Sequence, residues 1–335
     1  MRAWVIREPA PIESAPLELR ELPEPAPEPG EIVVDVSVCG VCRTDLHVVE
    51  GDLAPQRAEV IPGHQVVGRV SARGEGARRF AVGARVGVAW LWRACGACDF
   101  CRRSAENLCR AQRFTGWHEH GGYAERICVP EAFAYELPES LDDEAAAPLL
   151  CAGIIGYRAL RRSGISPGGR LGLVGFGSSA HIALQVARHW GARVFVVTRE
   201  ATHRALALSL GAEWAGDLGE RPPEKLDAAV LFAPAGELVP PTLESLAPGA
   251  TLACAGIHMS AVPSLDYARH LFEEKSLTSV TANTRADGRE LLALAAEIPL
   301  RPRTTSFEFS RANEALLALK RGLIAGSGVL RVSRP

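Results

Sequence analysis

Five short apolar runs alternate with helical stretches between residues 170 and 282. The runs are rich in Val, Leu and Ala, and continuous apolar runs of this length are typical of strands buried on both faces of a sheet. The stretches between them repeat apolar residues at helical spacing. This order predicts a parallel, doubly wound sheet, and hence an α/β fold class. The predicted strands are RLGLVGF, ARVFVV, LDAAVLF, GATLACAGI and SLTSVTA.

The first predicted strand runs directly into GFGSSA, residues 175–180. A G-x-G-x-x-A pattern between a strand and a helix predicts a turn that binds the pyrophosphate of a dinucleotide. Gly175 permits the tight turn, Gly177 lets the backbone approach the phosphates, and the helix N-terminus offers N–H groups. The residues expected to bind the cofactor here are Gly175, Gly177, Ser178 and Ser179.

The tip of the second predicted strand bears on the choice between NAD and NADP. NAD-binding chains usually place Asp or Glu there, where it binds the ribose 2′-hydroxyl. This chain has Thr198 and Arg199 instead, and a guanidinium suits a 2′-phosphate better than a hydroxyl. In the alternative, Arg199 is a solvated turn residue and Glu200 binds the ribose. The predicted cofactor is therefore NAD(P), and we favour NADP.

The first 150 residues show a different pattern, in which strands are separated by Gly- and Pro-containing turns and helices are few. After residue 285, a helix, a strand and a second helix form a segment too short for a domain. We expect that segment to join the N-terminal part. The predicted domains are 1–152 with 286–335, and 153–285.

Four cysteines lie close together in ACGACDFCRRSAENLC. Disulfides, an iron–sulfur cluster and a metal ion are the three interpretations. In bacterial ferredoxin runs the fourth cysteine follows after three residues and precedes a proline, whereas here seven residues intervene and an arginine follows. Short spacing in a Gly-bearing loop favours a closed zinc site, in a lobe of about residues 90–112. The four ligands would be Cys95, Cys98, Cys101 and Cys109.

Composition and charge argue against several other classes of protein. The formal net charge of −2 argues against a surface that binds nucleic acid or an anionic membrane. No apolar run reaches the ~20 residues of a membrane span, and the first residues lack the pattern of a secretion signal. We therefore expect a cytoplasmic protein, whose thiols stay reduced, which disfavours disulfides.

A second set of candidate metal ligands is spread along the chain. Cys42, His64 and Cys151 could together supply the three protein ligands that a catalytic zinc requires. However, isolated Cys and His residues in such runs are more often packed in the core. The spacing alone leaves both interpretations open.

Six segments follow one another along the chain: GVCRTDLHVVEGD, IPGHQ, ACGACDFCRRSAENLC, GGYAE, LLCAGIIGYRAL and GFGSSA. Their order resembles that of the zinc-dependent medium-chain alcohol dehydrogenases, and the resemblance covers the whole length of the chain. It implies a GroES-like, β-rich catalytic domain, a Rossmann cofactor domain, two zinc ions per subunit and a homodimer or homotetramer. It also implies hydride transfer between a small alcohol or aldehyde and the nicotinamide.

The resemblance implies a role for each matching residue. Cys42, His64 and Cys151 match the ligands of the catalytic zinc, and the four clustered cysteines match those of the structural zinc. Cys39 does not match a ligand, and we expect it to be packed at the end of a strand. The remaining matches are Thr44 and His47 in the proton relay, Asp45 as the carboxylate that bonds the ligand histidine, and Arg43 and Arg285 as phosphate contacts.

Three positions depart from the residues common in the family. Gln65 replaces a Glu beside the ligand histidine and so removes a negative charge near the metal, and Ile155 replaces a Thr that packs the nicotinamide. Trp90 matches an aromatic residue of the substrate pocket, whereas Leu53 replaces a Trp and should widen its mouth. We therefore expect medium-chain or aromatic primary alcohols and aldehydes as substrates.

Three other classes of protein share part of this sequence pattern. A polyol, threonine or formaldehyde dehydrogenase would share the fold and the metal sites. A zinc-free quinone reductase would lack both cysteine-containing sets, and a zinc-ribbon module that binds nucleic acid would need a basic stripe that this sequence lacks.

Overall fold

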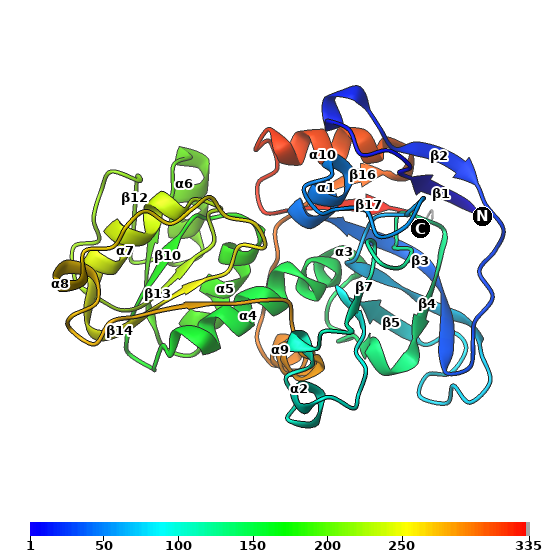
Figure 1. Ribbon diagram of the computed structural model, residues 1–335, viewed down its shortest axis with the longest axis horizontal. Helices are drawn as coiled ribbons and strands as arrows, with labels where there is room; N and C mark the ends of the chain where they lie inside the picture. Colours follow the sequence, from blue (N-terminus) through cyan, green and yellow to red (C-terminus); the bar gives the residue numbers. More distant parts are fainter. Residues whose placement is uncertain (333–335) are drawn as a thin grey trace. The chain divides into compact units, whose positions relative to one another are not determined.

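The computed structural model describes residues 1–332, which form two compact units (Figure 1). One unit contains Met1–Cys151 and the chain from Asn283 onward, and we call it the β-rich unit. The other contains Ala152–Ala282, and we call it the α/β unit. Among the described residues, no helix has both the length and the apolar character needed to cross a membrane.

The α/β unit contains a six-stranded sheet in which every neighbouring pair is parallel. The predicted parallel sheet is therefore confirmed, and the five predicted strands are all present. The sequence pattern missed one strand, β12, because three residues are too short to show a hydrophobic pattern. In spatial order the strands are β12 (Trp214–Gly216), β11 (Arg193–Val197), β10 (Arg170–Val174), β13 (Leu226–Leu231), β14 (Leu246–Cys254) and β15 (Ser276–Ser279).

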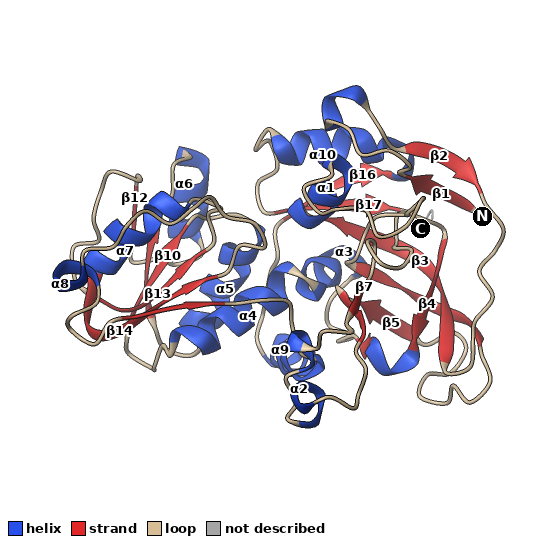
Figure 2. Ribbon diagram, viewed as in Figure 1, coloured by secondary structure: helices blue, strands red, loops and turns tan. Residues whose placement is uncertain are grey.

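Helices follow most strands of this sheet (Figure 2). The helix after β11 ends at Ser209, and Gly211 follows with a φ of 92°, a conformation that glycine adopts without strain. No helix lies between β12 and β13, which are joined by the loop 217–225. The helices are α4 (Ala152–Ser163), α5 (Ser178–His189), α6 (Ala201–Ser209), the 3-10 turn η5 (Gly236–Leu238), α7 (Val239–Ser245) and α8 (Tyr267–His270).

The β-rich unit is organised around a seven-stranded sheet. Its central strand β3 is rich in Val and Ile, and most of its residues are buried. The C-terminal strand β17 pairs antiparallel with β3, so the C-terminal segment joins the sheet formed by the N-terminal part of the chain. The strands are β16 (Thr304–Glu308), β17 (Ser327–Arg331), β3 (Glu31–Val41), β4 (Val66–Arg73), β5 (Arg85–Val88) and β9 (Ala134–Glu136), with β8 (Arg126–Pro130) beside β3.

Smaller elements complete the β-rich unit. Two strand pairs flank the main sheet, namely β1 (Arg2–Val5) with β2 (Glu18–Glu21) and β6 (Leu91–Arg93) with β7 (Arg113–Phe114). The helices are α1 (Arg43–Glu50), α2 (Asp99–Arg102), α3 (Asp143–Ala146), α9 (Arg285–Glu297) and α10 (Ala312–Lys320). The 3-10 turns are η1 (Ile12–Ser14), η2 (Glu106–Leu108), η3 (Glu131–Phe133), η4 (Ala147–Leu150) and η6 (Phe309–Arg311).

Candidate metal and dinucleotide sites

Cys42, His64 and Cys151 lie together in the β-rich unit, although they are far apart in sequence. Their ligand atoms all lie within 4.8 Å of one another, and the two sulfur atoms are 3.9 Å apart. Cys42 caps the start of α1, His64 precedes β4, and Cys151 follows η4. Three separate ends of secondary structure therefore meet at one point, which sequence spacing could not show.

The donor set at this point fits a metal ion. His64 is fully buried, and its Nε2 atom has no hydrogen-bond partner among the described residues. A buried polar atom without a partner is costly, whereas a bound cation would satisfy it. Two thiolates and one imidazole are a set that zinc prefers, and three protein ligands leave one position for another molecule.

Asp45 holds this arrangement from the first turn of α1. Its carboxylate is 1% exposed and accepts four hydrogen bonds. One oxygen accepts from His64 Nδ1 at 2.7 Å and from the Gly63 amide at 3.1 Å. The other accepts from the Cys42 amide at 2.9 Å and from the Tyr123 hydroxyl at 3.3 Å. Because Nδ1 is bonded to Asp45, Nε2 is the nitrogen that faces the two thiols.

The charges in the site shift the pKa of each ligand. Burial alone would lower the pKa of His64, but the Asp45 carboxylate and the Cys42 sulfur raise it to about 10. The hydrogen bond between the two sulfurs lowers the pKa of Cys42 well below its usual range, with help from His64. The same bond, together with burial, raises the pKa of Cys151.

Thr44 and His47 lie on α1, beyond Cys42. Thr44 is 6% exposed, and its hydroxyl oxygen is 3.8 Å from Cys42 Sγ. His47 is one turn further on, and its Nδ1 lies 2.7 Å from an oxygen of Asp52. Arg43, the first residue of the helix, is exposed. The helix therefore carries a metal-ligand cap, a buried hydroxyl and a histidine in one segment.

A row of aromatic rings extends from His64. The Trp90 ring meets the His64 ring edge-on at a centroid distance of 4.9 Å, and it stacks on Phe114 at 4.8 Å and on Trp117 at 6.0 Å. Trp117 donates its indole N–H to the Ala54 carbonyl, next to Leu53. The sequence analysis identified Trp90 but missed Phe114 and Trp117. The only local signal was the aromatic residue beside two histidines in GWHEH, which is Trp117.

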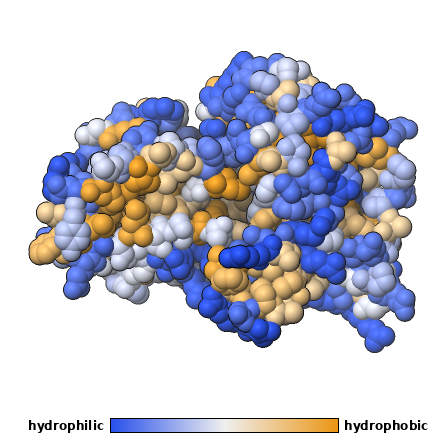
Figure 3. Space-filling model, viewed as in Figure 1, coloured by the Kyte–Doolittle hydropathy of each residue, from blue (hydrophilic) through white to orange (hydrophobic). Residues whose placement is uncertain are grey.

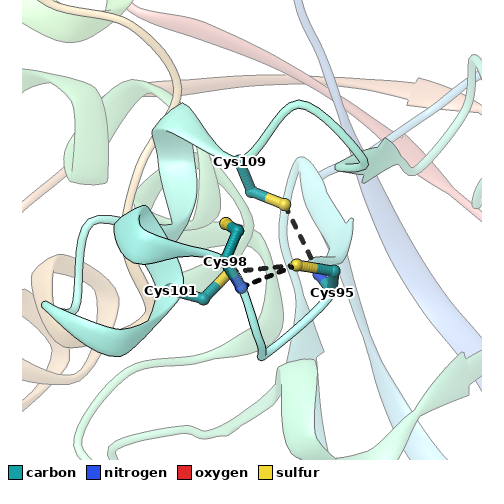
Figure 4. Close-up of side chains that lie close together, drawn as sticks. All are labelled: Cys95, Cys98, Cys101 and Cys109. Carbon is teal, nitrogen blue, oxygen red and sulfur yellow. Dashed lines mark hydrogen bonds between the residues drawn. The ribbon is translucent and has the colours of Figure 1, made fainter.

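The four clustered cysteines converge on one point in a separate lobe (Figure 4). Their sulfur atoms lie within 4.8 Å of one another. Backbone N–H groups of Ala97 and Cys98 point at the Cys95 sulfur and lower the pKa of Cys95 to about 6, which favours the thiolate. Four thiol groups in this arrangement fit a closed tetrahedral zinc site. Cys39 lies outside both sets and is fully buried in β3, as expected.

Glu106 connects this lobe to α9. Its carboxylate is nearly buried and accepts hydrogen bonds from the backbone N–H and the Nε atom of Arg285, at 3.0 and 3.1 Å. The Arg285 guanidinium also lies over the Phe133 ring, 4.7 Å from its centroid. Arg285 therefore has two partners within its own unit, and its role as a phosphate contact stays a prediction.

The GFGSSA turn of the α/β unit has the geometry of an anion-binding turn. Gly175 has a φ of 85°, and a Cβ atom there would lie 2.7 Å from the Ala233 nitrogen, so no other residue fits. Gly177 is the N-cap of α5, and space around its Cα is open. Ser178 and Ser179 form the first turn of that helix, whose N–H groups point toward the turn.

The residues after β11 place two arginines, each with an acidic partner, at the carboxyl end of the sheet. Thr198 is buried, whereas Arg199 is largely exposed and pairs with Glu200 at 2.8 Å. Arg204 donates to the carbonyl oxygens of Thr198 and Arg199, at 2.8 and 2.7 Å. Both arginines are thus held at the strand tip.

A cavity of about 160 Å³ lies beside this strand tip. The connection between β12 and β13 is a loop, so no helix fills this part of the sheet surface. The floor comes from strands β10, β11 and β13, one wall from the loop, and the other wall from η5 and α7. The lining includes Gly172, Val174, Val197, Leu218, Leu226, Leu238 and Pro241.

A parallel sheet with an anion-binding turn, together with a β-rich unit that holds a Cys–His–Cys set and a four-cysteine lobe, defines a metal-dependent dehydrogenase. The sequence matches the alcohol dehydrogenase GroES-like domain over residues 28–139 and the zinc-binding dehydrogenase family over residues 179–297. The chain therefore belongs to the zinc-dependent medium-chain alcohol dehydrogenase family, with GroES-like and Rossmann-type domains.

Known relatives cover almost the whole chain. "Probable alcohol dehydrogenase AdhA" of Mycobacterium tuberculosis is 53% identical, over 99% of this chain and 97% of that protein. An alcohol dehydrogenase of Geobacillus stearothermophilus is 35% identical, over 94% and 96%. A cinnamyl alcohol dehydrogenase of Sorghum bicolor has a similar structure, with a TM-score of 0.90 and 27% identity over 98% of this chain and 97% of that one.

Zinc uptake at the Cys42–His64–Cys151 set should depend on pH. Near neutral pH in the metal-free protein, His64 and Cys151 each hold a proton, because the pKa of each is raised. Zinc needs a neutral imidazole and two thiolates, so binding should release about two protons, and the affinity should rise as the pH rises. Calorimetric titration of the metal-free protein in buffers of different ionisation enthalpy measures this release. The His64→Ala variant retains the four-cysteine lobe, so its titration isolates the zinc binding of the lobe. A zinc affinity at the three-ligand set that does not change between about pH 6 and pH 8 would contradict the prediction.

Proposed function

We propose that this protein catalyses reversible hydride transfer between a primary alcohol and NAD(P), giving the aldehyde and NAD(P)H. The main support is the Cys42–His64–Cys151 set, in which the Nε2 atom of the buried His64 has no hydrogen-bond partner among residues 1–332 and faces two thiols. We also propose two zinc ions per subunit, the second held by Cys95, Cys98, Cys101 and Cys109. When bound at the three-ligand set, zinc supplies a Lewis acid that lowers the pKa of an alcohol or polarises a carbonyl.

The residues of α1 would carry the proton that the alcohol loses. We assign Thr44 as the hydroxyl that first accepts it and His47 as the group that passes it to solvent. The buried position of Thr44 near Cys42 supports this order, because a proton must leave a site from which water is excluded. Histidine suits the outer step because its usual pKa lies near neutral pH.

The aromatic row beside His64 supports a preference for medium-chain or aromatic primary alcohols. Trp90, Phe114 and Trp117 stack on one another and form an apolar wall on one side of the metal-ligand set. Leu53 precedes Ala54, whose carbonyl accepts from Trp117, and its side chain is smaller than that of tryptophan. Flat substrates can stack on such rings, whereas methanol and ethanol gain little from them.

The cofactor would bind along the carboxyl ends of the α/β strands. Gly175, Gly177 and the first turn of α5 would receive the pyrophosphate. The cavity beside β11 is large enough for a planar ring and would receive the adenine end. Arg199 and Arg204 at the strand tip support NADP over NAD, because a 2′-phosphate bound there would have two guanidinium groups nearby.

A homodimer or homotetramer is supported by the surface of the α/β unit. Strand β15 ends the sheet on one side in the part of the chain that is described, and its backbone can pair with another strand. Apolar residues reach the surface of this unit (Figure 3). Those that are more than a third exposed include Ile257, Val262, Tyr267, Phe272 and Leu277.

The first test is a spectrophotometric assay at the absorbance of the reduced nicotinamide. The purified protein should oxidise aromatic and medium-chain primary alcohols with NAD(P), with a higher kcat/KM than for ethanol. Because the proposal requires metal, a chelator should abolish the activity and zinc should restore it. Polyols, threonine and formaldehyde adducts serve as comparison substrates. Activity confined to any one of these, or to methanol and ethanol, would overturn the substrate assignment.

A second test concerns Arg199. Replacing it with alanine should lower kcat/KM for NADPH by about tenfold or more, because a charged hydrogen bond to the 2′-phosphate is lost, and should change kcat/KM for NADH little. Arg161→Ala, which removes an exposed arginine from α4 of the same unit, is the control. A strong preference for NADH that the Arg199→Ala variant retains would rule out NADP.

A third test concerns the proton relay. Thr44→Ala should lower kcat by about 10²-fold or more with zinc still bound, whereas Thr44→Ser should retain most of the activity. His47→Gln should cause a milder loss, concentrated at low pH. Wild-type rates in both Thr44→Ala and His47→Gln across the pH range would show that the relay assignment is wrong.

A further inference from the structure

The chain after α1 folds back so that Asp52 meets His47. Gly51, which ends the helix, has a φ of 86°, and a Cβ atom there would lie only 2.9 Å from Pro9 Cβ. The amides of Gly51 and Leu53 both donate to the His47 carbonyl, each at 3.1 Å. Since the residues on both sides of Asp52 are bonded to the same carbonyl, its backbone is fixed beside the His47 ring.

The side chains of this pair are in close contact. Asp52 Oδ2 lies 2.7 Å from His47 Nδ1, and the His47 side chain is 14% exposed while that of Asp52 is 48% exposed. An ionised carboxylate can only accept a hydrogen bond, so the hydrogen of a neutral His47 lies on Nδ1. Its Nε2 atom then carries the lone pair that can accept a proton.

The same chemistry orients the metal-site histidine. Asp45, also on α1, bonds Nδ1 of His64 at the same distance of 2.7 Å and leaves Nε2 for the metal. One helix and the turn that ends it therefore supply a carboxylate to Nδ1 of two different histidines. The two pairs differ in burial, because Asp45 is 1% exposed and Asp52 lies at the surface.

We propose that Asp52 is a positioning residue of the proton relay: its carboxylate holds neutral His47 as the Nδ1–H tautomer, so that Nε2 accepts the outgoing proton. This inference rests on the proposed function. When Nε2 accepts the proton, the ring becomes an imidazolium that keeps its Nδ1–H bond to Asp52. It then releases the Nε2 proton to solvent and returns to the neutral Nδ1–H tautomer, so the step moves one proton and changes no oxidation state.

Other carboxylates near α1 are held by different partners. Glu50, at the end of the same helix, accepts from Lys320 and from the Ile12 amide. Glu13 also pairs with Lys320. Since Asp52 is half exposed, solvent screens its charge and limits any effect on folding stability. Its contribution should therefore be to the orientation and tautomer of His47.

Nuclear magnetic resonance can read the tautomer directly. The zinc-loaded protein is labelled with ¹⁵N-histidine, and long-range ¹H–¹⁵N spectra are recorded at a pH where the His47 ring is neutral. His47→Gln identifies the signals by their loss. The wild-type ring should show a protonated Nδ1 and an unprotonated Nε2, the Asp52→Asn ring should show a mixture, and Asp52→Glu should restore the wild-type pattern. A protonated Nε2 in the wild type, or an unchanged pattern in Asp52→Asn, would overturn the proposal.

Kinetics provide the second measurement. Asp52→Asn should lower kcat for alcohol oxidation by about threefold to tenfold while KM for alcohol and cofactor stays within about twofold, because only the relay is affected. Asp35 is an exposed acid on β3 that pairs with Arg126, and the control variant Asp35→Asn should leave kcat and KM unchanged. An unchanged kcat in Asp52→Asn would also overturn the proposal. If no alcohol is oxidised by the wild type, the proposed function fails, whereas the spectra still decide which tautomer Asp52 holds.

Discussion

The buried carboxylate of Asp45 is the interaction on which the candidate metal site depends. A charged group that is 1% exposed is stable only when hydrogen-bond donors surround it, and Asp45 has four. These donors come from α1, from the loop before β4 and from Tyr123. Removing one partner of a buried charged pair costs about 3–5 kcal/mol, so the carboxylate ties these segments together. The position of His64 and the start of α1 are thereby set by one side chain.

The order of residues at the start of α1 follows from this constraint. Asp45 bonds the Cys42 amide, which fixes the first turn of the helix, and Thr44 lies between them. The same turn thus determines where the thiol, the hydroxyl and the carboxylate lie relative to one another. His47 follows one turn later, and the glycine that ends the helix brings Asp52 back to it. A short helix and the turn that ends it therefore bring a candidate metal ligand and the residues proposed for the proton relay together without long-range contacts between them.

The two halves of the chain differ in how far their sequence predicts their structure. The strands β10, β11, β13, β14 and β15 could be predicted because buried parallel strands leave continuous apolar runs, and the GFGSSA turn because it needs glycine at fixed positions. The Cys42–His64–Cys151 set could not, because its members come from separate loops whose approach depends on the register of β3 and β4. The spacing left this set as one of two interpretations, and the resemblance to a family favoured it. The helix α1 was not predicted either, because its buried face includes the polar Thr44 and Asp45. The stack of Phe114 and Trp117 on Trp90 was also missed, because it arises from the pairing of β6 with β7.

The four-cysteine lobe illustrates why a metal can be needed where a core is absent. Helix α2 has no buried residue, and Cys95 is exposed, so little apolar surface holds the lobe together. Thiol groups converging on one point without a metal would offer only weak hydrogen bonds, whereas a bound zinc contributes directly to folding free energy. The lobe is also anchored at its other end, where Glu106, three residues before Cys109, bonds the first residue of α9. Metal binding in the lobe would therefore stabilise the start of α9 as well, because the carboxylate that holds Arg285 belongs to the segment that the metal closes.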